Sequence, residues 1–251
     1  MQRATGRVFF TETRGNGVRT IIQVKDGNVV NDRLPPGYAV ANTVYNYGGS
    51  TTEALADGRV IFSNKDNTVK ILDPDTVKVS HLAGEDEALR YSNFSANDKN
   101  PWVLAIEEDH TIDTPEGTVN RIVAIHVDTG EVKRVVEGAD FYYPAEFSYD
   151  GTKLAWLEWD HPDQPWYAAR LYWAQFSEEA VVGHAHLVAG GLLNGVVEPH
   201  WGPDGSLFFG MESSNYRQLF RLRPGDKSAT QITLSGLEDA EFGELRLFPG
   251  R

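Results

Sequence analysis

Cysteine is absent from the 251 residues of this chain. Its absence excludes a disulfide framework, a thiol nucleophile and every metal site built on cysteine ligands. No window approaches the roughly eighteen consecutive apolar residues that a membrane-spanning helix needs. Residues 1–11 also lack the apolar run of a secretory signal. The sequence therefore predicts a cytoplasmic protein with no membrane partner.

Basic residues are few and scattered. The chain has 23 lysines and arginines and 36 aspartates and glutamates, which gives a formal net charge of −13. The longest basic cluster is Lys133-Arg134, so the field of the chain repels a phosphate backbone and predicts no nucleic-acid partner. No glycine-rich loop fits a dinucleotide or P-loop pattern, and we expect no cofactor.

A turn followed by a strongly apolar strand recurs along the chain, and each copy is followed by a strand, a turn and another strand. The copies of the first phrase are residues 6–10, 57–62, 98–106, 150–156 and 204–209. In most of these turns aspartate caps the turn and glycine supplies a positive φ. Repeats of about 40–50 residues with four short strands each are typical of propeller blades. The sequence predicts an all-β fold, a β-propeller of about five four-stranded blades.

The repeat places all of residues 1–251 in one propeller domain. The expected blades are residues 1–45 with 241–251, then 46–88, 89–140, 141–194 and 195–240. The first repeat begins at its second strand, and the sequence predicts a further strand at residues 244–248 that has no partner within its own repeat. That strand could supply the missing inner strand of the first blade and close the ring. Alternatively, the chain is part of a longer propeller.

Several phrases resemble the propeller of prolyl oligopeptidase-family serine peptidases, specifically the dipeptidyl-aminopeptidase and acylaminoacyl-peptidase branch. They are Tyr47-Gly48-Gly49 and residues 57–64, 107–110, 119–125, 150–166, 199–205 and 240–243. The resemblance implies a propeller that gates or recognises substrate beside an α/β-hydrolase domain. The nucleophilic serine of that domain lies in a G-x-S-x-G turn, and Gly48-Gly49-Ser50-Thr51-Thr52 lacks the last glycine. We therefore expect no peptidase activity from this chain by itself.

Loops that join second to third strands gather on one face of a propeller, and here we place residues 107–110 in such a loop. Candidate ligand-binding residues on that face, together with aromatic residues that could line an apolar funnel, are Asp109, His110, Asp160, His161, Glu212, Tyr142 and Trp159. The aspartate–histidine pairs could transfer protons or bind an ion. They could equally cap turns and face solvent.

A second set comes from counting four residues back from each turn aspartate, which gives Glu53, Phe94, Glu146 and His200. Alternation along a strand predicts that Glu53, Glu146 and His200 share a face near the central channel. Two carboxylates and a histidine could carry out acid–base catalysis, or they could form a structural hydrogen-bond network between blades. His184 and His186 have a ligand-like spacing without a third ligand, so no metal is expected.

The sequence leaves three functions open. In the first, the chain is a non-catalytic recognition propeller whose partner is a hydrolase domain or another protein. Alternatively it is an isomerase, cyclase or lyase acting on a small apolar molecule in the central channel. The expected channel ligand in general is a small molecule or a peptide. The third possibility is an interaction scaffold.

Overall fold

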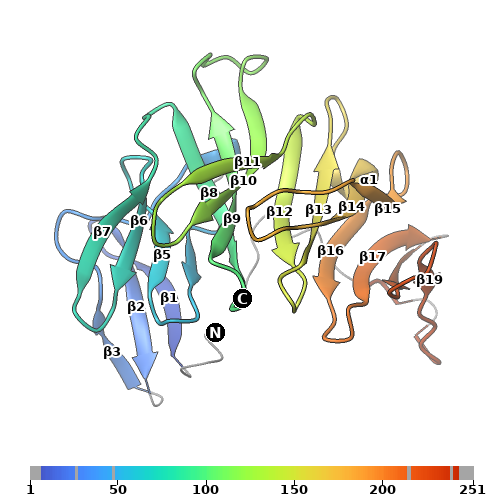
Figure 1. The fold of residues 1–251 in the computed structure, drawn as a ribbon, viewed down its shortest axis with the longest axis horizontal. Helices are drawn as coiled ribbons and strands as arrows, with labels where there is room; N and C mark the ends of the chain where they lie inside the picture. Colours follow the sequence, from blue (N-terminus) through green and yellow to red (C-terminus); the bar gives the residue numbers. More distant parts are fainter. Residues whose placement is uncertain (1–6, 26–27, 47–48, 214–215, 238–239, 243–251) are drawn as a thin grey trace. The chain divides into compact units, whose positions relative to one another are not determined.

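The computed structural model describes residues 7–25, 28–46, 49–213, 216–237 and 240–242. Nearly all regular structure in these residues is β-strand, arranged in antiparallel sheets (Figure 1). The predicted all-β class is confirmed, and the similarity to propeller structures reported below supports the architecture. Among the described residues, no helix is long and apolar enough to span a membrane.

The five sheets follow one another along the chain. The first contains β1 (Val8–Thr13), β2 (Arg19–Lys25) and β3 (Asn28–Asp32). The second contains β4 (Thr52–Ala54), β5 (Val60–Ser63), β6 (Val69–Asp73) and β7 (Lys78–Ala83). The third contains β8 (Leu89–Ala96), β9 (Trp102–Asp109), β10 (Val119–His126) and β11 (Val132–Val136). The fourth contains β12 (Phe141–Phe147), β13 (Lys153–Trp159), β14 (Arg170–Gln175) and β15 (His186–Gly190). The fifth contains β16 (Val196–Trp201), β17 (Leu207–Ser213), β18 (Tyr216–Leu222) and β19 (Thr230–Gln231). Two short helical turns, η1 (Val44–Asn46) and α1 (Pro165–Ala168), lie in the connections.

The chain divides into two compact units. The first holds the β1–β3 and β4–β7 sheets and most of the β8–β11 sheet, and the second holds residues 120–122 and 135–247. Each unit has its own apolar clusters, around Ile61 and Val123 in the first and around Leu157 and Phe209 in the second. The single domain and the blade boundaries proposed from the sequence stay predictions.

The strands expected to be apolar on both faces are buried. Every residue of β5 is buried, as is every residue of β9 before Asp109. In β13, Trp156 is 2% exposed and Leu157 fully buried, although their side chains point to opposite faces of the strand. β1 is less buried than these strands.

The turns before these strands have the chemistry that the repeat predicts. Gly58, Gly151 and Gly205 have φ of 100°, 73° and 77°, a region that favours glycine. Asp150 Oδ1 accepts hydrogen bonds from the hydroxyls of Ser148 and Thr152 and from the Thr152 amide. These hydrogen bonds lower the pKa of Asp150 to about 2.

Three inner strands carry an irregularity at one equivalent place. The pairing register shifts between Ser92 and Ser95 in β8, between Tyr143 and Glu146 in β12, and between Val197 and His200 in β16. Such β-bulges insert extra residues and reverse the alternation of side chains beyond them. The register places Ser95, not Phe94, at the position of Glu146 and His200. The repeat count was wrong there because Asp98 is the second of the five residues between β8 and β9, whereas Asp57, Asp150 and Asp204 are the third residues of equally long turns.

The ring closure predicted for residues 244–248 lies outside the described residues. Within the part of the chain that the structure describes, β1 pairs with β2.

Candidate functional site

Strand β9 ends in acidic residues, and two of them are buried. Alternation points Glu107 and Glu108 to opposite faces of the strand, and they are 2% and 3% exposed. We expected residues 107–110 in a loop, but the strand extends through Asp109. A buried carboxylate is costly unless charges or hydrogen-bond donors surround it, so the partners of each glutamate define its role.

Glu107 has a structural role. Its carboxylate accepts a hydrogen bond from the Tyr91 hydroxyl at 3.1 Å and one from Arg134 Nε at 3.3 Å. Burial, and then the negative charge of Glu107, raise the pKa of Tyr91. Glu107 therefore joins β8, β9 and β11 inside the third sheet.

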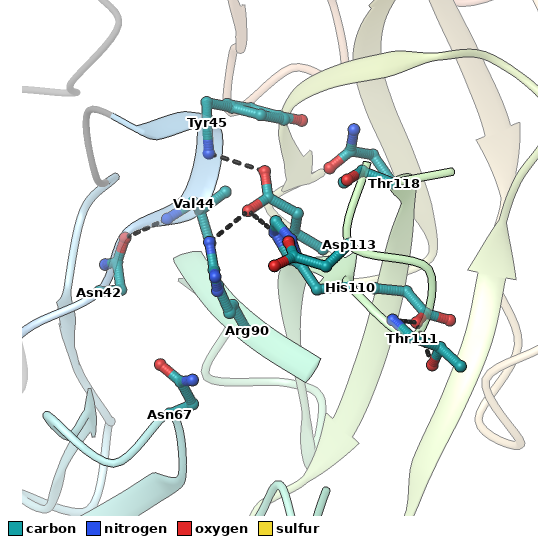
Figure 2. Close-up of polar contacts among 12 residues, drawn as sticks. Asn42, Val44, Tyr45, Asn67, Arg90, His110, Thr111, Asp113 and Thr118 are labelled. Carbon is teal, nitrogen blue, oxygen red and sulfur yellow. Dashed lines mark hydrogen bonds and ion pairs between the residues drawn. The ribbon is translucent and has the colours of Figure 1, made fainter. Parts of the chain in front are cut away.

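Glu108 is the centre of a second cluster, drawn in Figure 2. Its Oε2 accepts a hydrogen bond from the Tyr45 amide at 2.7 Å. Its Oε1 lies 2.7 Å from His110 Nε2 and 3.5 Å from a guanidinium nitrogen of Arg90. The three partners come from η1, the segment after β9, and β8. One buried carboxylate thus fixes three separate parts of the first unit.

Tyr45 is held in an unusual conformation. Its φ and ψ are 55° and 23°, a left-handed region that costs a tyrosine about 1–3 kcal/mol. The Glu108 bond stabilises this conformation, and Asn42 Oδ1 accepts hydrogen bonds from the amides of Val44 and Gly49 on either side. Tyr45 as a whole is partly exposed. Strained residues with such support concentrate at functional sites.

The segment between β9 and β10 adds acidic groups to the Glu108 cluster. His110 Nδ1 lies 2.8 Å from Asp113 Oδ1, and the Asp113 side chain is 80% exposed. Asp109, by contrast, caps its own turn, because its Oδ1 accepts hydrogen bonds from the amide and hydroxyl of Thr111. Of this predicted pair, the structure therefore places His110 in the cluster and gives Asp109 a local role.

The second predicted aspartate–histidine pair lies in the second unit. Asp160 Oδ2 accepts a hydrogen bond from Arg170 at 2.6 Å, and Oδ1 accepts one from the Asp140 amide. Burial alone would raise the pKa of Asp160, but the Arg170 and Asp140 hydrogen bonds outweigh it and the pKa is lowered. His161 does not pair with Asp160; its Nδ1 lies 3.2 Å from Asp140 Oδ2, and both side chains are largely exposed.

The remaining ligand-binding candidates differ in exposure. Tyr142 is fully buried, and its hydroxyl accepts a hydrogen bond from the Ala139 amide; burial raises its pKa to about 12. Trp159 is 7% exposed and stacks on Phe141. Both are core residues in this structure. Glu212 is partly exposed on β17, opposite Arg217 of β18.

Two of the three acid–base candidates meet. His200 Nδ1 on β16 lies 3.0 Å from Glu146 Oε2 on β12, with 64% and 25% of the side chains exposed. The Trp201 indole also donates a hydrogen bond to the Glu146 backbone oxygen. Glu53 lies on β4 in the first unit.

No group of three or more histidine, aspartate or glutamate side chains that could hold a metal ion occurs among the residues described. The rings of His184 and His186 meet edge to face, and the His186 ring also stacks on Trp173.

Of the Glu108 cluster, only His110 was predicted from the sequence. Tyr45 lies 63 positions before Glu108, and neither Tyr45 nor Arg90 belongs to a motif. The sequence feature that could have indicated the cluster is the acidic end of β9. Two consecutive glutamates in an apolar strand place one carboxylate on each face, so both are buried when both faces are covered.

No model of a known protein family matches the sequence, and no curated protein matches it. Solved structures do match. Over 93% of its length the chain is similar to a puromycin-hydrolyzing peptidase of Mycobacterium tuberculosis, with 25% identity and a TM-score of 0.80. Over 97% it is similar to a puromycin hydrolase, with 23% identity and a TM-score of 0.85. The chain spans 40% of each of these peptidases.

The structural neighbours include peptidases of the prolyl oligopeptidase family, as the sequence phrases indicated, and they match nearly all of this chain. An oligogalacturonate lyase in complex with manganese is also similar over 93% of this chain and 63% of its own, with 12% identity and a TM-score of 0.69. At that identity the likeness concerns the fold alone.

Proposed function

We propose that this chain is a recognition propeller for peptide-like ligands that works beside a hydrolase domain and has no peptidase chemistry of its own. The observation that carries the proposal is the match of 93% of the chain to a peptidase of which it spans 40%. No serine in the sequence stands in a G-x-S-x-G turn, which agrees with a recognition role.

The Glu108 cluster suggests the class of ligand. Tyr45, which is partly exposed, and the exposed carboxylate of Asp113 lie around the buried Glu108 carboxylate (Figure 2). An aromatic face and a carboxylate together suit an ammonium group, and the net charge of −13 attracts cations. The ligand class is therefore a peptide or aminoacyl compound with a free amino group.

Puromycin, which carries such an amino group, is the probe for calorimetric titration of the purified chain. We expect saturable binding, weakened about tenfold by Tyr45→Ala, within the range of one cation–π contact. Tyr149→Ala is the matched control, because Tyr149 is a 46% exposed tyrosine of the second unit. The absence of binding at millimolar puromycin, or equal losses in both variants, would overturn the ligand assignment.

The lack of peptidase chemistry has a separate test. A fluorophosphonate probe labels activated serines, and we expect no labelling of this chain. Stoichiometric labelling that a single serine substitution abolishes would show a hydrolase.

The Glu146–His200 pair favours a second candidate, acid–base catalysis of the lyase type. A carboxylate 3.0 Å from Nδ1 can orient an imidazole so that Nε2 acts as a base. The experiment is an elimination assay on oligogalacturonate and on small uronides, followed by absorbance of the unsaturated product. Activity that His200→Gln removes would support this candidate, and its absence would leave the pair as a structural contact between β12 and β16.

A further inference from the structure

His110 lies between two carboxylates that belong to different segments. Its Nε2 is 2.7 Å from Glu108 Oε1, and its Nδ1 is 2.8 Å from Asp113 Oδ1. An ionised carboxylate only accepts hydrogen bonds, so each ring nitrogen must donate one, and a neutral imidazole has a single N–H. With both carboxylates ionised, only the imidazolium form of His110 satisfies both contacts.

The surrounding structure restrains the Glu108 carboxylate much more than the Asp113 carboxylate. The Glu108 side chain is 4% exposed, and it is fixed by the Tyr45 amide and by Arg90 of β8. The Asp113 side chain is 80% exposed and belongs to the connection between β9 and β10. If the ring loses a proton, one nitrogen lone pair faces a carboxylate oxygen. Because Glu108 cannot turn away, the Asp113 contact is the one that breaks.

The His110–Asp113 contact links the two ends of residues 110–113, the first half of the segment 110–118. The second half is closed by Thr114, whose backbone oxygen accepts hydrogen bonds from the amides of Gly117 and Thr118. The charged groups facing His110 are Glu108 from β9 and Asp113 from the connection, with Arg90 of β8 reaching it through Glu108. The Asp109 carboxylate instead binds Thr111. The His110–Asp113 pair is thus the charged contact that holds Asp113 toward β9.

We propose that residues 110–118 form a proton-operated loop, closed while His110 is an imidazolium and loosened when His110 becomes neutral. The closing interaction is present while both ring nitrogens carry a proton and is lost when one proton leaves, so raising the pH weakens it. Because Asp113 and Tyr45 belong to the same cluster, loosening the loop changes the proposed ligand site; this consequence rests on the proposed function.

The test measures amide hydrogen exchange of residues 110–118 in the full chain between pH 5.5 and 8.5, corrected for intrinsic exchange rates, alongside the ring ¹⁵N shifts of His110. We expect protection to fall about tenfold across this range, as the loss of one charge-assisted hydrogen bond implies. The fall should follow the loss of the second ring proton.

The deciding variant is Asp113→Asn. Its amide donates to a neutral ring nitrogen, so the loop should stay protected at pH 8.5 and the pH dependence should disappear. Glu116→Gln, an exposed glutamate of the same loop, is the control and should behave as the wild type. The proposal would be overturned if the exchange protection of the wild type did not change with pH, or if Asp113→Asn kept the wild-type pH dependence. No ligand is present, so either result leaves the recognition function to its own test.

Discussion

Arg59 joins two sheets of the first unit, because its guanidinium lies 2.9 Å from the carboxylate of Asp128 in the turn after β10. The same guanidinium lies 2.6 Å from Asp57 in its own turn. Arg7 occupies the equivalent position before β1, and its guanidinium lies 2.9 Å from Asp75 in the turn after β6. In both cases a basic residue directly before a strand, Arg7 before β1 and Arg59 before β5, contacts the neighbouring sheet.

The first prediction is that Arg59 and Asp128 are energetically coupled. A double-mutant cycle of Arg59→Ala and Asp128→Ala should give a coupling free energy of about 0.2–1 kcal/mol, as partly exposed ion pairs do. Urea denaturation at low and high salt is the measurement, and salt should weaken the coupling. The Lys99–Asp98 pair, with both side chains about 60% exposed, is the control. Equal coupling in both cycles would mean that the Arg59 contact adds nothing specific.

The second prediction concerns the core of the fourth sheet. Trp156 is 2% exposed and its indole donates a hydrogen bond to Glu158. Trp156→Ala should lower the free energy of unfolding by about 3–5 kcal/mol, because it leaves a cavity. Trp166→Ala is the matched control, since Trp166 is 51% exposed and its loss should cost less than about 0.5 kcal/mol. A loss below about 1 kcal/mol for Trp156→Ala would contradict the buried strand.

The third prediction tests the buried carboxylate of Glu108. Glu108→Gln keeps the shape but removes the charge that accepts from His110 and Tyr45, so it should cost about 3–5 kcal/mol, as breaking a buried charge pair does. Glu116→Gln on the adjacent loop should have almost no effect. Chemical denaturation followed by tryptophan fluorescence gives both values. Near-equal stabilities would indicate that Glu108 is not buried as described.

The fourth prediction is a pH effect at the turn of Asp150. The folded pKa of about 2 lies below the ordinary aspartate value of 3.8, so this group stabilises the fold above pH 4, and the stabilisation is lost as the pH falls from about 4 through 2. Since the side chain is largely exposed, the contribution should be no more than about 1 kcal/mol. Asp150→Asn keeps the acceptor oxygen and should flatten the stability profile in this window. An unchanged profile would locate the acid sensitivity elsewhere.

The fold was predictable because the signals are local and repeated. Each turn has its own aspartate or glycine, and each second strand is apolar on both faces, as β5 and β13 confirm. The meeting of Glu146 and His200 followed from the same repeat. Their chemical role stays a prediction.

The Glu108 cluster could not be predicted, because it depends on contacts across 63 positions of sequence, from Tyr45 to Glu108. Backbone conformation also decides it, since nothing in the sequence requires a left-handed Tyr45. The assignment of Phe94 was wrong for a related reason. Counting back from an aspartate fails where the aspartate stands one position earlier in the turn, as Asp98 does, and the pairing register places Ser95 at that position.

The bulges divide each of the strands β8, β12 and β16 into two parts whose side chains alternate independently. Residues before the bulge alternate in one phase, and Glu146, His200 and Ser95 beyond it alternate in another. A substitution at these three positions therefore leaves unchanged the set of side chains that the rest of the strand sends to the core. One architecture can carry a carboxylate, an imidazole or a hydroxyl at this position, and new chemistry can be sampled there without rebuilding the sheet.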